Sequence, residues 1–197
     1  SYKIMTYPET TDIDLKENVQ SALEQQSNAR SNDDALRGRE YSIGNLFKDV
    51  TDGASVGILF EMPADASCFA FVDTRFSTTG KWYVQKIEEV TKDVSGTSID
   101  PKNRLIANGA PSASGEFGAS VSGGNEWSPK VVGSTAGAGG NISLSPASSN
   151  GSAVIVQPGE NVYFTAQNVS NGEADVSIDV DWTETPISEI ESLVEGL

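Results

Sequence analysis

Residues 173 to 184, EADVSIDVDWTE, constrain the fold more than any other stretch. Apolar and polar side chains alternate strictly over ten residues, with Ala174, Val176, Ile178, Val180 and Trp182 on one side and Asp175, Ser177, Asp179, Asp181 and Thr183 on the other. This alternation predicts a strand with one face in a core and one face in water. A slip of one residue would bury three aspartates, so the pattern also sets the register. We expect the long last strand of a β-sandwich.

Other stretches have similar strand signals between turn residues. They are residues 39–47, 54–61, 67–73, 81–91, 153–157 and 161–169. In 81–91 the part VQKIEEV also fits a helix, and Leu59 interrupts the polar side of 54–61. Asn171-Gly172 separates the last two strands, which predicts a hairpin in which 161–169 and 173–184 pair antiparallel. The fold class expected is mainly β, an antiparallel, jelly-roll-like β-sandwich.

Residues 95–152 differ in composition from the rest of the chain. Between Gly109 and Ser152 there are ten glycines, eleven serines and six alanines in 44 residues. This segment is too rich in glycine for a helix. We expect a Gly/Ser-rich excursion from the sandwich domain at 38–184, with wandering loops and one or two short strands, near 130–133 and 141–144.

Both ends of the chain predict helices outside the sandwich. Residues 1–37 are expected to form an extended arm followed by a helix at 12–26, whose narrow apolar face comprises Leu15, Val19, Ala22 and Leu23. Residues 185–197 predict a short amphipathic C-terminal helix, with Pro186 at its first position. Each helix needs a surface to pack on. The four residues of the N-terminal face are therefore candidate partner-binding residues, unless that helix folds back on its own domain.

The charge is strongly and unevenly negative. The formal net charge is −15, from 28 acidic and 13 basic residues, and after Arg104 one lysine faces eleven acids. Such a surface repels nucleic acid and anionic lipid. No apolar run approaches the roughly 18 residues that cross a membrane, and the first residues lack the pattern of a secretory signal. The composition is similar to that of proteins from extreme halophiles, where salt screens the self-repulsion.

The sequence offers few residues for catalysis or metal binding. It has no histidine and one cysteine, Cys68, which excludes His-based nucleophile schemes and Cys- or His-based zinc sites. Cys68 is expected to be a small buried hydrophobe. Adjacent Glu88 and Glu89 would face opposite sides of a strand, and the aspartates of 173–184 are collinear, unlike a calcium cage. Trp127 is either a loop anchor or an aromatic that stacks on a sugar or partner. We therefore expect no enzyme activity, no catalytic or metal site and no cofactor.

Several motifs resemble those of a family of small structural proteins of tailed viruses, of the capsid decoration, turret or head-fibre type. The matching positions are Asp52-Gly53, Thr79-Gly80, Asn103-Arg104, Pro158-Gly159 with Tyr163, Asn168 with Ser170, and Trp182 with Glu184. The resemblance covers residues 38–184 and implies a β-sandwich attached to the head or tail of a virion. It transfers no catalytic residue. The acidic bias and the N-terminal helix depart from the family and suggest a virus of a halophilic archaeon.

These expectations define a leading function and two alternatives. The leading one is a non-enzymatic virion structural protein, displayed on the capsid as a homo-oligomer, trimer or pentamer, beside other virion proteins such as the major capsid protein. One alternative is a capsid-forming jelly roll of a haloarchaeal membrane-containing virus. The other is a cell-surface, carbohydrate-binding sandwich that uses a contact such as Trp127. Neither nucleic acid nor a membrane is expected as a partner.

Overall fold

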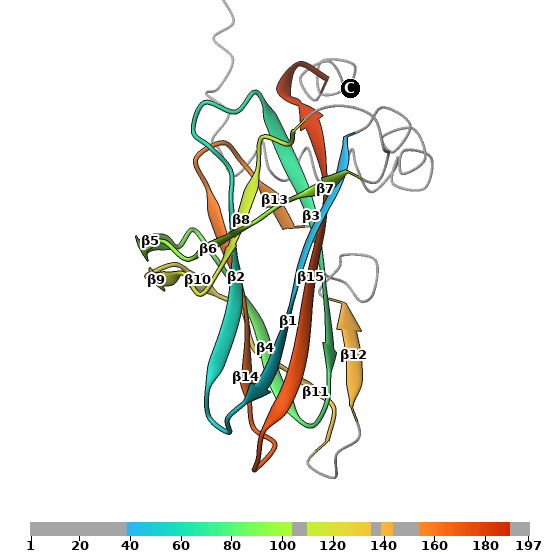
Figure 1. Cartoon of the computed structure of the whole chain (residues 1–197). Coiled ribbons are helices and arrows are strands. Elements are labelled where there is room, and N and C mark those ends of the chain that lie inside the picture. The colour runs from blue at the N-terminus through green and yellow to red at the C-terminus, as the bar shows by residue number, and fades with distance from the viewer. Residues whose placement is uncertain (1–38, 104–109, 135–138, 144–153, 190–197) are drawn as a thin grey trace, which may run out of the picture.

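The computed structural model describes residues 39–103, 110–134, 139–143 and 154–189. These residues form two antiparallel sheets that pack as a β-sandwich, with a two-stranded ribbon beside them (Figure 1). The mainly β class predicted from the sequence is confirmed. In chain order the strands are β1 (Glu40–Val50), β2 (Ser55–Glu61), β3 (Cys68–Thr78), β4 (Trp82–Glu88), β5 (Thr91–Val94), β6 (Thr97–Ile99), β7 (Lys102–Asn103), β8 (Ser114–Phe117), β9 (Ser120–Ser122), β10 (Asn125–Glu126), β11 (Lys130–Val132), β12 (Gly140–Ser143), β13 (Val154–Val156), β14 (Asn161–Asn168) and β15 (Ala174–Pro186).

The strand pairs are nested along the chain. Sheet A has the order β12-β3-β15-β1-β7, with β13 also pairing with β3, and sheet B has the order β10-β4-β14-β2-β8-β6, with β11 also pairing with β4. Thus β1 pairs with β15, β2 with β14, β3 with β12 and β13, and β4 with β10 and β11. Each step from β1 to β4 changes sheet. The early strands therefore pair antiparallel with the late strands in nested order, and successive pairs alternate between the two sheets.

Strand β15 forms the centre of sheet A, as its alternation predicts. Its apolar residues from Ala174 to Trp182 are buried in the core, and Trp182 is 1% exposed. The Trp182 ring stacks on Tyr41 of β1, with 5.6 Å between ring centroids. It also meets Phe60 of β2 edge-on, at 5.2 Å, which joins the two sheets. Burying one such aromatic side chain contributes about 1.5–3 kcal/mol.

The predicted hairpin between 161–169 and 173–184 is wrong. Strand β14 pairs with β2 and β4 in sheet B, whereas β15 pairs with β1 and β3 in sheet A. The link between them is an arch across the core, and the buried Asn168 holds it. The Asn168 side-chain amide donates to the carbonyl oxygens of Val50 and Gly172, both at 2.7 Å, and its side-chain oxygen accepts from the amide of Ser170 at 2.9 Å. Local turn chemistry at Asn171-Gly172 does not distinguish an arch from a hairpin.

Turn motifs that are far apart in the sequence meet at this end of the sandwich. The amide of Gly53, from the Asp-Gly turn after β1, donates to the carbonyl oxygen of Asn168 at 2.8 Å. The amide of Lys81 donates to the hydroxyl of Ser170 at 2.8 Å. A Cβ at Gly80 would come within 2.4 Å of the same hydroxyl, and Gly80 has a φ of 73°. The turns that contain Gly53, Gly80 and Ser170 therefore form one network.

The described part of the segment 95–152 contains more strands than the one or two predicted. The predicted strands at 130–133 and 141–144 are present as β11 and β12, which pair with β4 and β3. Unexpectedly, β8 pairs with β2 along Ile58–Glu61, and Ala113 and Val132 are part of the main core. Glycine permits this packing, because a Cβ at Gly115 would lie 2.1 Å from the Ile43 side chain. The sequence did not predict these strands because they pair through backbone hydrogen bonds and contribute few hydrophobic side chains to the core.

The same segment explains the position of Leu59. On the outer face of sheet B, Leu59 forms a second apolar cluster with Val90 and Ala119, against which Ile87, Val121 and Tyr163 pack. The ribbon of β5 and β9 carries part of this cover (Figure 1). Leu59 therefore interrupts the polar side of its strand because that side is covered here.

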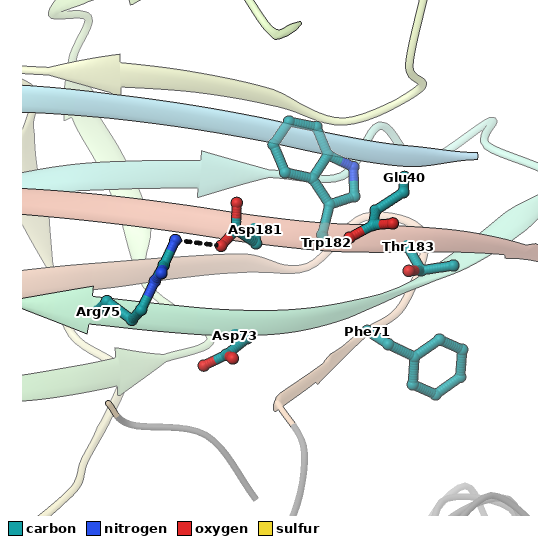
Figure 2. A pocket seen from close by; sticks show the side chains of 7 residues that line it. All are labelled: Glu40, Phe71, Asp73, Arg75, Asp181, Trp182 and Thr183. Carbon is teal, nitrogen blue, oxygen red and sulfur yellow. Dashed lines mark hydrogen bonds and ion pairs between the residues drawn. The ribbon is translucent and has the colours of Figure 1, made fainter. Parts of the chain in front are cut away.

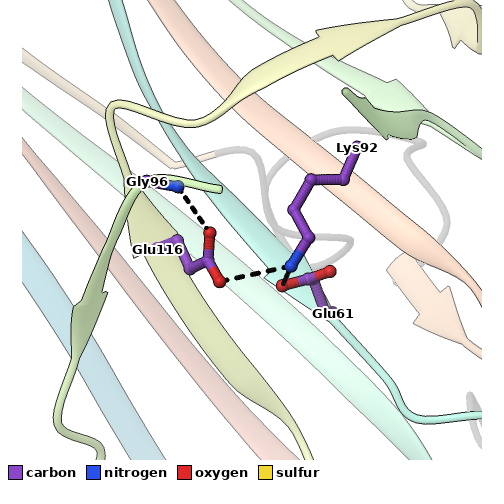
Figure 3. Close-up of polar contacts among 4 residues, drawn as sticks. All are labelled: Glu61, Lys92, Gly96 and Glu116. Carbon is purple, nitrogen blue, oxygen red and sulfur yellow. Dashed lines mark hydrogen bonds and ion pairs between the residues drawn. The ribbon is translucent and has the colours of Figure 1, made fainter. Parts of the chain in front are cut away.

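A charged cluster fastens the ribbon to sheet B. The Lys92 ammonium of β5 lies 2.7 Å from a carboxylate oxygen of Glu61 and 3.2 Å from one of Glu116 (Figure 3). The second oxygen of Glu116 accepts the Gly96 amide at 2.8 Å. This bond from Gly96, followed by the contact with Lys92, lowers the pKa of Glu116 below its ordinary 4.5. The hydrogen bond to Glu61 raises the pKa of Lys92.

Acid should release the ribbon before it unfolds the sandwich. The ionised form of Glu116 contributes stability that is fully present above pH 4.5, and that is lost as the pH falls through its lowered folded-state pKa. Hydrogen exchange followed by mass spectrometry should show β5 and β9 losing protection at a higher pH than β14. In the Glu116→Gln variant the ribbon should already exchange faster at pH 7, while β14 is unchanged. Equal acid sensitivity of the ribbon and β14 in the unmodified protein would contradict this role.

The terminal helices predicted from the sequence are not supported by the described residues. Residues Ile187 to Glu189 are helical, whereas Pro186, expected to begin the helix, is the last residue of β15. The backbone continues as a strand here because Pro186 and Thr185 still pair with the start of β3. The rest of the C-terminal helix, the N-terminal arm and the helix at 12–26 lie outside the described residues.

Candidate functional site

The outer face of sheet A carries two adjoining hollows. One, of about 270 Å³, is lined by Glu40, Phe71, Asp73, Arg75, Asp181, Trp182 and Thr183. The other, of about 470 Å³, lies along β1 and also includes Arg75 and Asp181 in its lining. Figure 2 shows the Arg75 and Asp181 side chains pointing toward each other from neighbouring strands, where they form an ion pair at 2.9 Å. This pair lies where the two hollows adjoin, and the two together form the outer groove of sheet A.

The strand register determines the charges of the outer groove. Asp73 on β3 lies directly opposite Asp181 on β15, and Arg75 lies opposite Asp179. Like charges that face each other across a strand pair are destabilising. The guanidinium of Arg75 offsets this repulsion by bonding diagonally to Asp181. The groove therefore combines carboxylate acceptors with one guanidinium and suits polar or cationic groups of a partner.

The aspartates predicted as a solvated row on β15 each make local contacts. The Asp175 side chain accepts from the backbone amide of Asp49 at 2.8 Å, and Asp179 accepts from the hydroxyl of Ser177 at 3.3 Å. In the part of the chain that the structure describes, no three carboxylate or cysteine side chains are grouped as metal ligands. No helix in that part is long and apolar enough to cross a membrane.

Adjacent Glu88 and Glu89 have separate partners. Glu88 forms an ion pair with Lys86 at 3.2 Å, whereas Glu89 accepts from the side-chain amide of Asn125 at 2.8 Å. Glu89 follows the end of β4 and has a φ of 58°. The two carboxylates contact different residues, so the structure does not bring them together as an acid–base pair.

Trp127 lies against a lysine that faces the core. The Lys86 ammonium is 3.5 Å from the centroid of the Trp127 ring, and the Trp127 amide donates to the Lys86 carbonyl oxygen at 3.1 Å. Burial lowers the pKa of Lys86, and its ion pair with Glu88 opposes this shift. These contacts fit the prediction of a loop anchor. Trp127 as a whole is 44% exposed, which leaves part of the residue available to a ligand.

Cys68 is a buried side chain, as predicted. It lies beside the buried Glu184, at 3.6 Å from a carboxylate oxygen, and 3.5 Å from the hydroxyl of Ser112. Burial raises the pKa of the Cys68 thiol, which disfavours the reactive thiolate. Its environment is consistent with a structural role.

The sequence and the structure place the candidate interaction surface differently. The partner-binding residues predicted from the sequence, Leu15, Val19, Ala22 and Leu23, lie outside the described residues. The structure instead shows the outer groove, whose lining includes the exposed Leu46 and which the sequence did not predict. One signal was available: Leu46 is an apolar residue on the polar side of its strand.

Comparisons with known proteins show no family. No protein-family model matches the chain, and no curated protein matches it significantly. Among solved structures, a mutant VP2 protein of infectious bursal disease virus in derived T=1 particles is 11% identical, with a TM-score of 0.17, over 78% of this chain and 42% of that chain. The Gx strain of the same virus gives 9% identity and a TM-score of 0.10, over 78% and 41%. The chain thus spans less than half of these proteins, and likenesses this low carry no argument.

Proposed function

We propose that this protein is a non-enzymatic structural component of a virion, displayed on the capsid of a tailed virus of a halophilic archaeon. The observation that carries the proposal is the nested strand pairing, β1 with β15, β2 with β14, β3 with β12 and β13, and β4 with β10 and β11. This is the connectivity of a jelly roll, an eight-strand architecture that recurs in viral capsid proteins and lectins. The segment from β5 to β9 is then an insertion between the fourth and fifth strand positions.

Two further observations support the proposal. Three of the motifs that resemble the viral family meet in one network of turns, which closes one end of this sandwich. The net charge of −15 favours a soluble particle surface in concentrated salt, where self-repulsion is screened. A decoration or turret role and a capsid-forming role both fit the topology. A lectin role is favoured separately by the exposed residue Trp127.

Quantitative mass spectrometry of purified particles, combined with electron microscopy, tests the proposed function. We expect the protein on particles, in a ring of three or five copies at a capsid axis. A copy number equal to that of the main shell protein would favour the capsid-forming alternative. Absence from particles, together with retention on glycan columns that is lost in Trp127→Ala, would favour the lectin.

The N-terminal apolar face should be required for incorporation. Replacing Leu15 and Leu23 by serine removes two of its larger side chains, each worth about 1.5–3 kcal/mol when buried. The double variant should melt at nearly the same temperature as the unmodified protein but be lost from particles. Val56→Ser, a change in β2 of the sandwich, should instead lower the melting temperature. Normal loading of the double variant would mean that this face is not the anchor.

A further inference from the structure

Strand β1 has an edge that is only partly covered. On one side it pairs with β15 from Glu40 to Phe47. On the other side, within the described residues, only β7 pairs with it, opposite Tyr41 and Ser42. If this register continued, Pro101 would lie opposite Ile43. Proline has no amide hydrogen, so it cannot continue the ladder. The chain instead crosses to sheet B at β6, so β1 has no described neighbour on that side from Ile43 to Phe47.

The larger hollow of the outer groove runs along this edge. Five consecutive residues of β1, from Ser42 to Leu46, line it, together with Ile99, Asp100 and Lys102. Successive side chains of a strand point to opposite faces. Five consecutive residues cannot all point into one hollow from a single face. The hollow therefore opens onto the backbone at the edge of β1. Leu46 is 52% exposed there, which makes it one of the most exposed large apolar side chains in the described residues.

The charge and length of the free edge limit what can bind. The hollow contains three aspartates, Asp100, Asp179 and Asp181, against Arg75 and Lys102, so a basic side chain is favoured over an acidic one. The free edge ends near Phe47, because the register shifts between Phe47 and Val50 and Asp49 has a φ of 52°. A segment of about five residues, extended, partly apolar and weakly basic, would complete the ladder by strand addition.

We propose that residues 1–8 of a second copy of this chain, SYKIMTYP, add to the free edge of β1. This segment has one charge, Lys3, and its Tyr, Ile and Thr residues favour strands. Pro8 would end the pairing, as Pro101 ends that of β7. Residues 9–38 can span at most about 100 Å when extended, and about 70 Å with the expected helix at 12–26, enough in either case to reach a neighbouring subunit. Exchange of an identical strand between subunits is a low-cost route to oligomers. The inference rests on the proposed assembly of the protein in a virion.

Cross-linking between differently tagged copies tests this pairing. A tagged Lys3→Cys chain and an untagged Leu46→Cys chain would be co-expressed and treated with a short bis-maleimide. We expect a product that contains both chains, at least tenfold more abundant than with Asp93→Cys, an exposed control on β5, in place of Leu46→Cys. Each variant should melt as the unmodified protein does. A yield equal to that of the control would overturn the proposal.

The double variant in one chain identifies the alternative occupant. A link formed only within single chains would show that the segment covers its own β1, and the second copy would be ruled out. Deleting residues 1–8 should reduce the oligomer mass in light scattering without changing the melting temperature. A failed cross-link, with the protein still present on particles, would refute strand exchange and leave the proposed function standing. A successful cross-link, with the protein absent from particles, would support strand exchange and refute the proposed function.

Discussion

Replacing Asn168 by leucine should lower the melting temperature by about 10 °C or more. The side chain is fully buried and bonds to Val50, Ser170 and Gly172. Leucine is of similar size but leaves two carbonyl oxygens and one amide without these partners. The buried carbonyl oxygen of Val50 costs about 1–3 kcal/mol when orphaned, whereas water partly replaces the part-buried contacts of Ser170 and Gly172, at about 0.5–1.5 kcal/mol each. Each kcal/mol lowers the melting temperature by about 2–4 °C in a domain of this size. Thermal unfolding followed by circular dichroism, in the same salt for both proteins, measures the shift.

The matched control is Gln167→Leu on the neighbouring position of β14. Gln167 is exposed, and its side-chain amide makes one hydrogen bond, to the Gly53 carbonyl oxygen at 3.2 Å. Its loss should cost about 0.5–1.5 kcal/mol at most, because water replaces the partner. Asn168→Asp should be nearly as damaging as Asn168→Leu, since a carboxylate cannot donate to the two carbonyl oxygens. Equal shifts for Asn168→Leu and Gln167→Leu would show that the arch does not depend on this amide.

Replacing Glu184 by alanine should open the opposite end of the sandwich. Its buried carboxylate accepts the backbone amides of Ser112 at 3.0 Å and Ala113 at 2.9 Å, and the indole N–H of Trp182 at 3.3 Å. These bonds tie β15 of sheet A to the segment that leads into β8 of sheet B. Alanine leaves the donors unpaired and creates a cavity, at a combined cost of about 3–5 kcal/mol. We expect a large fall in melting temperature and faster hydrogen exchange at residues 112–117.

Two further variants are compared with Glu184→Ala: Glu184→Gln is the conservative change at the same position, and Glu126→Gln is the surface control. The glutamine at 184 keeps one acceptor oxygen but turns an NH₂ group toward the amide donors, so its effect should be intermediate. Glu126 is exposed on β10, and its replacement should change the stability by less than about 0.5 kcal/mol. If Glu184→Ala melts like Glu126→Gln, the carboxylate is not what closes this end.

The elements predicted most accurately were those whose side chains alternate. The pattern from Ala174 to Trp182 determined a strand, its register and its buried face before any tertiary contact was considered, because period-two alternation has one stable placement at a core boundary. The strands at 39–47, 54–61 and 161–169 followed for the same reason, and β1 extends three residues further than its prediction, to Val50. Composition also indicated correctly that Cys68 is buried.

The tertiary structure alone decided which strands pair. Asn171-Gly172 has the chemistry of a hairpin, yet the chain crosses between sheets there, because Asn168 is held by the end of β1, more than a hundred residues earlier. Strands β6, β8 and β9 were not predicted because strands that pair through backbone hydrogen bonds need little hydrophobic side-chain surface. The outer groove and the free edge of β1 also depend on register and on where Pro101 ends a ladder. Local sequence thus determined which residues face the core, whereas contacts distant in sequence determined the order of the strands, because backbone hydrogen bonds are alike for every residue except proline.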